Sequence, residues 1–327
     1  MNIDEEGLRY AKELIANSDI VAFPTETVYG LGANAYDLWG VEKIFTAKGR
    51  PFDNPLIIHI SDKKMIEEIA CEIPEDAQKV IDAFMPGPIT IVLKKKDIIH
   101  DRVTGGLSTV AIRMPESDEA QEFLKFVGVP IAAPSANTST RPSPTCYEHV
   151  LEDLDGKIPL VLKGRSCEIG IESTVVDFTR KTPTVLRPGI ITASEISEII
   201  SKPVSGISTE DKTMNSPGLR YKHYSPNSDM WLNTDGNVDK ILDKYNEFTR
   251  DGKKVAVFAQ NKFFDVFSTL NFFDLGFDER DGARMIFSLL REGEKQFDTL
   301  IVVWDYTSEV GLSVLNRLKK SSSEKTF

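Results

Sequence analysis

The hydrophobic pattern of the chain is interrupted over residues 204–228, and this interruption limits the possible folds more than any other feature. Within it, residues 216–226 read SPGLRYKHYSP and follow a segment rich in Ser and Thr. Pro217 and Gly218 favour turns rather than regular structure. A chain of 327 residues can form two domains that each bury a hydrophobic core. We predict one domain over 1–203, a linker over 204–228 and a second domain over 229–327.

The last third of the chain alternates between helical and strand patterns. Apolar, strand-like runs occur at 254–258 and 300–304, and helical periodicity precedes each of them. Such alternation is typical of a parallel sheet whose strands are connected by helices. We predict a small three-layer α/β domain, Rossmann-like in architecture, with helices near 237–250, 281–292 and 308–319.

The first 200 residues mix strands and helices without regular alternation. This mixture predicts an α/β domain with a mixed, twisted sheet. The predicted strands lie at 20–23, 55–60, 89–93, 109–113, 129–133, 158–162, 173–178 and 184–187. The predicted helices lie at 4–17, 41–48, 62–70 with Ser61 as its cap, and 74–84, and two more begin near Ser117 and Ser143.

Composition and charge exclude several classes of protein. Asp plus Glu number 50 against 39 Lys plus Arg, and the resulting net charge of −11 disfavours binding to nucleic acid through general phosphate neutralisation. The N-terminus lacks the apolar segment of a signal peptide, and no apolar run is long enough to span a membrane. Cys71, Cys146 and Cys167 are isolated, which argues against a zinc module or a disulfide framework. We therefore expect a cytoplasmic protein.

The basic residues concentrate at turns rich in Gly, Pro and Ser. This placement indicates a local pocket for an anion, although turns are exposed and exposed residues are often charged. The residues in question are Lys48, Arg50, Arg113, Arg141, Lys163, Arg165, Arg187, Arg220 and Lys222.

Residues 23–32, FPTETVYGLG, directly follow a predicted buried strand. Thr27 and its neighbours offer hydroxyl groups, and Gly30 and Gly32 would allow the backbone to approach a ligand. A glycine-containing loop with incidental threonines explains the stretch equally well.

Residues 48–60, KGRPFDNPLIIHI, combine a basic turn with a buried strand. Lys48 and Arg50 flank Gly49, where a helix is expected to end, and short rigid turns of this kind suit phosphate binding. His59 lies between isoleucines, so from the pattern alone a core histidine is the preferred interpretation.

Three further stretches place polar residues where a ligand could bind. Residues 133–144 set hydroxyl groups and Arg141 between the end of a strand and the start of a helix, where α/β sheets commonly bind ligands and free backbone N–H groups attract anions. An ordinary capped loop is the alternative. In residues 170–177 and 185–189, polar residues interrupt apolar strands.

The order of these motifs closely resembles that of the YrdC-like threonylcarbamoyl-AMP synthases. The matching stretches are FPTETVYGLGA, AKGRPFDNPLIIHI, MPGPITIVL, VAIRMP, VPIAAPSAN, GIESTVVD and VLRPG. SPGLRYKHYSP and the region after it resemble the long, two-domain form of this family. The resemblance implies an enzyme that joins L-threonine, bicarbonate and ATP into threonylcarbamoyl adenylate and releases pyrophosphate, for the N6-threonylcarbamoyladenosine modification of tRNA.

The resemblance also implies roles for particular residues. L-Threonine would be surrounded by Thr27, His59, Arg113, Ala133 and Ser173, with Arg113 as a bidentate partner of its carboxylate. ATP would be held by Arg50, Asn54, Thr109, Ser135, Ser143, Arg187, His223 and Tyr224. Lys48 and Arg50 are the implied catalytic residues, because the adenylation transition state concentrates negative charge. Mg²⁺ would accompany ATP without a dedicated protein cage, and the linker would act as a lid over the site.

The resemblance implies that a separate tRNA-modifying threonylcarbamoyl transferase complex uses the product, so contact of this chain with tRNA is expected to be weak or indirect. Two other functions are compatible with the fold. A carbamoyl-adenylate module of hydrogenase-maturation carbamoyltransferases would carry zinc-finger cysteines and an acylphosphatase-like segment, which this sequence lacks. A direct RNA-binding protein would use the basic groove, and the net charge of −11 counts against it.

Overall fold

The computed structural model describes residues 1–206 and 224–327, and its internal contacts divide these residues into two compact units. The predicted boundaries at 203/204 and 228/229 stay predictions, and most of the predicted linker lies outside the described residues. The first unit contains Met1–Ser139, Pro144–Glu168 and the described residues that follow Ile171, up to 206. The second unit contains the described residues from Tyr224 to Phe327, together with Thr140–Ser143 and Ile169–Ile171.

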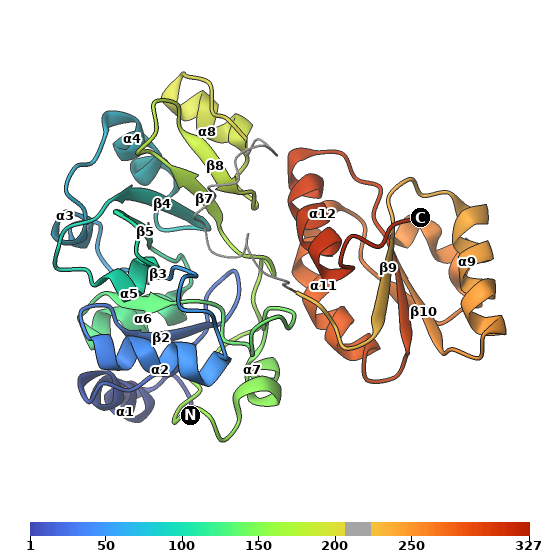
Figure 1. Ribbon diagram of the computed structural model, residues 1–327, viewed down its shortest axis with the longest axis horizontal. Helices are drawn as coiled ribbons and strands as arrows, with labels where there is room; N and C mark the ends of the chain where they lie inside the picture. The colour runs from blue at the N-terminus through green and yellow to red at the C-terminus, as the bar shows by residue number, and fades with distance from the viewer. Residues whose placement is uncertain (207–223) are drawn as a thin grey trace. The chain divides into compact units, whose positions relative to one another are not determined.

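The first unit is built on an eight-stranded mixed sheet, as the sequence predicts (Figure 1). Its strand order is β1-β2-β6-β3-β5-β4-β7-β8. The β3–β5 and β4–β7 pairs are parallel, and the other neighbouring pairs are antiparallel. The strands are β1 Val21–Phe23, β2 Gly30–Asn34, β3 Ile57–His59, β4 Ile89–Lys94, β5 Thr109–Arg113, β6 Ile131–Ala133, β7 Thr174–Asp177 and β8 Thr184–Arg187.

Side-chain caps fix the starts of several helices in this unit. Asp4, Asp37 and Ser117 each accept a hydrogen bond from a backbone N–H in the first turn of α1, α2 and α6. Thr192 and Glu195 form a capping box at the start of α8. The helices are α1 Glu5–Ala16, α2 Leu38–Lys48, α3 Met65–Ile69, α4 Glu75–Phe84, α5 Asp101–Thr104, α6 Asp118–Val127, α7 Tyr147–Leu154 and α8 Ala193–Ile200.

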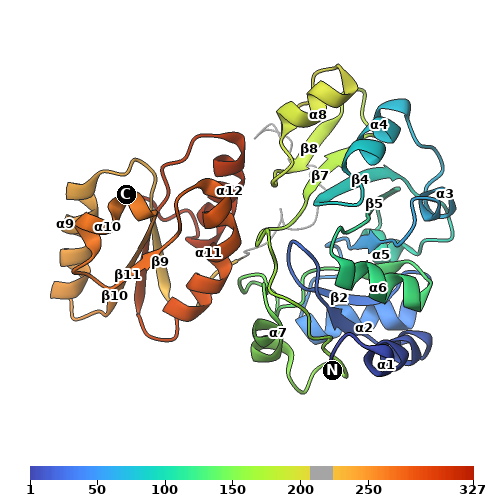
Figure 2. The ribbon, with the colours of Figure 1, turned by 180° about the vertical axis from the view of Figure 1, so that it is seen from behind.

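The two faces of this sheet are covered differently. On one face, strand residues such as Ile58 and Ile112 pack in a large hydrophobic core with α2, α3, α4 and α8 (Figures 1 and 2). On the other face, α1 and α6 pack over the end formed by β1, β2 and β6. The middle of this second face carries a smaller apolar cluster whose members all come from strands. They are Ile57, Val92, Ala111, Val175 and Leu186.

Two predicted helix starts were wrong. Ser61 does not cap α3, because Asp62 turns the chain first by accepting a hydrogen bond from the Lys64 N–H, and the helix begins at Met65. The helix predicted to start at Ser143 begins instead at Tyr147, because the Pro144 carbonyl accepts a hydrogen bond from the Tyr29 N–H (2.9 Å) and so follows a different path.

The strand predicted at 158–162 is also wrong, since this stretch pairs too briefly to form one. Ala22 and Val161 make an isolated bridge, with hydrogen bonds from the Ala22 N–H to the Leu160 carbonyl and from the Leu162 N–H back to Ala22. The segment therefore borders β1 without extending the sheet as a regular strand.

Gly30 and Gly32 lie inside strand β2 rather than in a loop that approaches a ligand. A Cβ atom at Gly32 would lie 2.5 Å from Ile131 Cγ2 and 2.9 Å from the Phe23 ring, and one at Gly30 would lie 3.0 Å from the same ring. The two glycines therefore make room for the buried Phe23 side chain. This packing explains both glycines, and their predicted role in ligand approach stays a prediction.

The second unit has a four-stranded, fully parallel sheet in the order β11-β10-β12-β9, which confirms the predicted three-layer α/β architecture. Helices α9 and α10 pack on one face. Helix α11 lies on the other, where Gly282 and Gly293 contact Trp304 and Phe258. The elements are β9 Asp229–Asn233, α9 Val238–Arg250, β10 Val255–Ala259, η1 Asn261–Phe263, α10 Phe264–Phe267, β11 Phe272–Asp274, α11 Glu279–Gly293, β12 Thr299–Val303 and α12 Glu309–Ser321.

The segment Thr140–Ser143 is tied to the rest of the second unit by an ion pair and by a hydrogen bond to its backbone. Arg141 binds both carboxylate oxygens of Glu294, with Nη1 donating to Oε2 at 2.7 Å. Arg291, which is fully buried, donates to the Pro142 carbonyl at 2.5 Å. Four residues from near the middle of the sequence thus fold as part of a unit formed mainly by residues 224–327.

In neither unit do the described helices include one that combines the length and the apolar character needed to cross a bilayer.

Candidate functional site

The pairing of β3 with β5 and β6 brings several predicted site residues onto one face of the sheet. His59 lies opposite Arg113 in the parallel β3–β5 ladder, and Ile57 lies opposite Ala133 in the antiparallel β3–β6 ladder. Because alternate residues of a strand point to the same face, these side chains share the second face with the strand-only apolar cluster. The site is therefore positioned by strand register.

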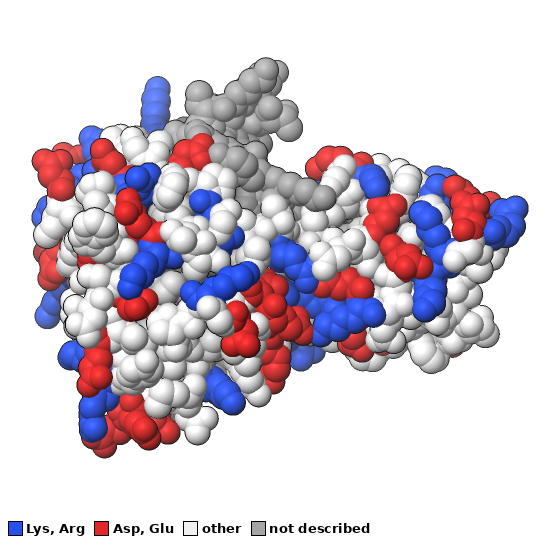
Figure 3. Space-filling view, turned by 60° about the horizontal axis from the view of Figure 1, so that its bottom comes forward, with Lys and Arg blue, Asp and Glu red and all other residues white. Residues whose placement is uncertain are grey.

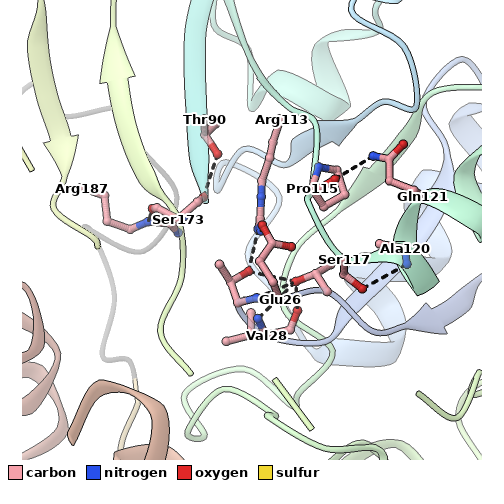
Figure 4. Close-up of polar contacts among 12 residues, drawn as sticks. Glu26, Val28, Thr90, Arg113, Pro115, Ser117, Ala120, Gln121, Ser173 and Arg187 are labelled. Atoms are coloured by element: carbon pink, nitrogen blue, oxygen red, sulfur yellow. Dashed lines mark hydrogen bonds and ion pairs between the residues drawn. The ribbon is translucent and has the colours of Figure 1, made fainter. Parts of the chain in front are cut away.

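Arg113 is the central polar residue of this face. Its side chain is 4% exposed, and the guanidinium donates from Nη1 to Thr27 Oγ1 (2.7 Å) and from Nη2 to Glu26 Oε1 (2.5 Å) (Figure 4). Glu26 is also buried, so the two charges form an ion pair inside the protein. Both ends of the guanidinium fork are thus occupied by the chain's own side chains.

The loop between β1 and β2 holds these two partners in place through local hydrogen bonds. The Thr25 hydroxyl donates to the Val28 carbonyl at 2.7 Å and contacts the Thr27 hydroxyl at 2.9 Å. Thr27 is fully buried. The loop is therefore a compact turn that presents Glu26 and Thr27 to Arg113.

Glu26 is a site residue that our reading of the sequence missed. In residues 23–32 the pattern indicates the hydroxyl groups as candidate ligands, and hydroxyl groups are typical of a polar loop. The available signal was a single carboxylate between two threonines, directly after a buried strand. The role of this carboxylate became visible only in the fold, which places Arg113, 87 positions later, beside it.

His59 is a buried, neutral histidine beside the arginine. Its Nδ1 lies 3.2 Å from the Ile57 carbonyl, and its ring meets the Phe23 ring edge-on with centroids 5.8 Å apart. Burial and the positive charge of Arg113 lower the pKa of His59 to about 3. The imidazole is therefore uncharged at neutral pH. A buried, neutral ring of this kind is compatible both with a core residue and with one wall of a site.

A second polar group on this face links β4, β7 and β8. Ser173 is fully buried, and its hydroxyl lies 2.7 Å from the Thr90 hydroxyl. Arg187 donates from Nε to the Ser173 carbonyl (3.0 Å) and from Nη2 to the Ser173 hydroxyl (3.1 Å) (Figure 4). The predicted threonine ligand Ser173 and the predicted ATP ligand Arg187 are thus in direct contact, and Thr90 is a further member that the sequence did not single out.

Lys48 contacts the loop that follows β6. Its ammonium group is buried and donates to the carbonyl oxygens of Ser135 and Asn137, and it lies 3.4 Å from Asn137 Oδ1. The Ser135 hydroxyl in turn donates to Asn137 Oδ1 at 2.5 Å. Two predicted residues, Lys48 and Ser135, are therefore brought together, with Lys48 fixing the backbone of the loop that carries Ser135.

The turn after α2 is closed by Arg50. Its guanidinium donates to the carbonyl oxygens of Asn54 (3.2 Å) and Pro55 (3.0 Å), and Asn54 is buried. Thr109 begins β5 and lies on the same face as Arg113, two alternations along the strand. Arg50 and Asn54 therefore share one turn, and Thr109 shares a strand with Arg113.

The remaining predicted ATP ligands belong to the second unit or fall outside the described residues. Ser143 is buried and belongs to the second unit. Tyr224, also in the second unit, has a left-handed backbone with φ of 63° and stacks its ring on Phe287, with centroids 5.3 Å apart. Within the predicted lid over 204–228, His223 and the other residues of 207–223 lie outside the described residues.

An acidic cavity adjoins the Arg113–Glu26 pair. Its volume is about 340 Å³, and Glu26 lies in its wall. The other lining residues are Thr25, Glu116, Ser117, Asp118, Glu119, Arg165, Ser166 and Glu168. Within residues 1–206 and 224–327, no group of three or more His, Cys, Asp or Glu side chains has the arrangement of a metal site.

Family models match both parts of the chain. The model described as "Telomere recombination", of the Sua5, YciO and YrdC proteins, matches residues 13–189. The model described as "Threonylcarbamoyl-AMP synthase, C-terminal domain" matches residues 191–323. Together they span most of the sequence.

Named relatives and a solved structure agree with these models. The chain is 42% identical to threonylcarbamoyl-AMP synthase of Pyrococcus abyssi, over 98% of this chain and 95% of the relative, and 39% identical to that of Bacillus subtilis, over 98% and 94%. The crystal structure of P. abyssi Sua5 complexed with L-threonine superposes with a TM-score of 0.91 at 40% identity, covering 99% of this chain and 96% of that one. This chain therefore belongs to the threonylcarbamoyl-AMP synthase family.

Proposed function

We propose that this chain joins L-threonine, bicarbonate and ATP into threonylcarbamoyl-AMP and releases pyrophosphate, and that it is thus a nucleotidyltransferase. The observation that carries the proposal is the buried Arg113, held by Thr27 and Glu26 on the sheet face that also presents His59. A buried, fixed guanidinium suits an anionic group such as the amino-acid carboxylate.

Threonine would lie against the second face of the sheet. Arg113 would take the carboxylate, while Thr27, His59 and Ser173 surround the rest of the molecule. Because His59 is neutral, it adds no second positive charge beside Arg113. Ala133 and the apolar cluster around Ala111 provide a surface for the threonine methyl group.

ATP would enter as its magnesium complex and would be held by residues around the same face. Arg187 and Arg50 would place positive charge near the phosphates, where the reaction develops negative charge on the α-phosphate and on the departing pyrophosphate. Lys48 would act by fixing the loop that carries Ser135. The remaining proposed nucleotide contacts are Asn54, Thr109, Ser143, His223 and Tyr224.

In the proposed reaction, the threonine amine loses its extra proton and combines with bicarbonate to give a carbamate and water. A carbamate oxygen then attacks the α-phosphorus of ATP, and pyrophosphate leaves. The chain's contribution is to hold the reactants in line and to stabilise the charge. We propose that the product is passed to a separate transferase complex in the cytoplasm, which modifies tRNA. On the face shown in Figure 3, Lys and Arg lie interspersed with Asp and Glu, which supports weak or indirect tRNA contact.

The test is pyrophosphate release with each substrate omitted in turn. The expected result is release that requires L-threonine, bicarbonate and ATP together. Serine should react more weakly, since losing one methyl group from a fitted contact costs on the order of 1 kcal/mol or somewhat more. Equal turnover of threonine, serine and glycine would contradict the assignment of the amino acid.

A further inference from the structure

We propose that Glu26 binds the α-ammonium group of the amino-acid substrate, so that the Glu26–Arg113 ion pair recognises both charged ends of a zwitterion. The inference rests on the proposed function and deepens it, because it gives a substrate-binding role to a residue of the motif FPTETVYGLGA for which the resemblance implied none. It also implies that Arg113 binds the carboxylate through Nε, because Nη1 and Nη2 donate to Thr27 and Glu26.

The ion pair has one unused hydrogen-bonding atom on each side. Glu26 uses Oε1 for Arg113, whereas its Oε2 is buried without a hydrogen-bond partner among the described residues. Arg113 uses Nη1 and Nη2, whereas its Nε is likewise buried and unpaired there. Buried polar atoms without partners are rare, because each one costs the free energy of its lost hydration. Within this one ion pair, Arg113 Nε therefore lacks an acceptor and Glu26 Oε2 lacks a donor among the described residues.

An amino acid supplies the groups that these two atoms lack. Its ammonium group is a donor for Glu26 Oε2, and its carboxylate is an acceptor for Arg113 Nε. Since the ion pair and the zwitterion are each neutral, their union adds no uncompensated charge to the interior. A carboxylate that displaced Glu26 from Arg113 would instead leave the Glu26 carboxylate buried without its cation. The charge balance therefore favours Glu26 as a ligand over Glu26 as a displaced competitor.

The cavity beside Glu26 offers the ammonium group a route to this carboxylate. Its volume of about 340 Å³ lies within the range of small-molecule sites, ~300–1,000 Å³. Its walls carry Glu116, Asp118, Glu119 and Glu168 besides Glu26, with Arg165 as the basic residue. An anionic cavity concentrates cationic groups. Because Oε2 is covered in the structure, binding requires the Glu26 carboxylate to turn toward the cavity.

The experiment compares two ligands on three proteins by titration calorimetry. The ligands are L-threonine and 2,3-dihydroxybutanoate of the same configuration, in which a hydroxyl group replaces the ammonium group. The proteins are the full chain, Glu26→Gln and Glu122→Gln. The substitution Glu26→Gln keeps the shape of the side chain and an oxygen for the contact with Arg113 but removes the charge. Glu122 is an exposed carboxylate of α6 outside the cavity, so its variant is the matched control.

We expect the unaltered chain and Glu122→Gln to prefer threonine by about 10- to 150-fold, the range of a hydrogen bond to a charged group. In Glu26→Gln this preference should fall to within about threefold, with ATP affinity unchanged. If the unaltered chain binds both ligands equally, the inference is overturned without any variant. It is also overturned if Glu26→Gln keeps the full preference for threonine. An unaltered chain that does not bind threonine at all overturns the proposed function itself.

Discussion

At the scale of single residues, the candidate site is a set of buried polar side chains that hold one another. Arg113 is fixed by Thr27 and Glu26, and Arg187 is fixed by Ser173. Side chains held in this way lose little further freedom when a ligand binds, which is the physical basis of preorganisation. Replacements that keep charge but change geometry should therefore be poorly tolerated.

Arg113→Lys tests this expectation. Lysine keeps the positive charge but cannot donate in two fixed directions to Thr27 and Glu26, so the partners lose their alignment. We expect the KM for threonine to rise at least about tenfold, the loss of one hydrogen bond to a charged group, while the KM for ATP changes little. Steady-state kinetics with each substrate varied in turn measure both values. A rise in the KM for ATP alone would show that the residue roles are misassigned.

His59 makes stability depend on pH in a defined window. Its folded pKa of about 3 lies below the ordinary value of about 6.5, so below pH 6.5 the unfolded chain binds a proton that the folded chain does not. Stability is thus fully present above pH 6.5 and falls between pH 6.5 and 3, by up to about 1.4 kcal/mol for each pH unit from this group. Urea unfolding at several pH values measures the slope. His59→Gln should flatten it over this window, and an unchanged slope would rule His59 out as its source.

At the scale of elements, the site is placed by the register of β3 with β5 and by close packing among β1, β2 and β6. The register puts His59 opposite Arg113, and the glycines of β2 let the Phe23 ring pack against His59. Packing of this density tolerates little added volume.

Gly32→Ala should destabilise the first unit by about 1–3 kcal/mol through overpacking, because the new methyl group would lie 2.5 Å from Ile131 Cγ2. The measurement is the denaturant midpoint of the transition of the first unit. Gly206→Ala is the control, since among the described residues a Cβ atom there meets nothing within 4 Å. Equal midpoints for the two variants would mean that the core relaxes around the added group.

The elements that the sequence predicted best are those whose apolar runs are long and continuous. The strands around 89–93 and 109–113 and the alternation after residue 237 were found because burial on both faces leaves little ambiguity. Strand β2 was missed because Gly30 and Gly32 carry no strand signal, and close packing against Phe23 and Ile131 explains them. Glu26 was missed because its partner lies far along the chain.

At the scale of the whole molecule, the two compact units do not correspond to two continuous stretches of sequence. Thr140–Ser143, which includes a predicted ATP ligand, takes its contacts from Glu294 and Arg291. No local pattern could have revealed this, because the paired residues are 153 and 149 positions apart. The second unit therefore supports a segment that the motifs assign to the nucleotide site.

A chain cut after about residue 205 tests this dependence. The truncated protein keeps the eight-stranded sheet, so it should fold and bind ATP weakly. It loses Glu294 and Arg291, which hold the Thr140–Ser143 segment, and also the predicted lid. We expect most of the pyrophosphate release to be lost, measured beside a thermal melt that confirms folding. Full activity of the truncated chain would show that neither the segment's contacts nor the linker matters for turnover.

The ion pair between Arg141 and Glu294 also bears on how this family evolves. The Glu294 side chain is nearly buried, at 5% exposure, so a change at either position removes the other residue's partner in this ion pair. Natural selection should then couple the two sites, so that substitutions at 141 and 294 arise together across two-domain relatives. Relatives that end near residue 205 have no counterpart of Glu294, so the residue at position 141 should vary more freely in them.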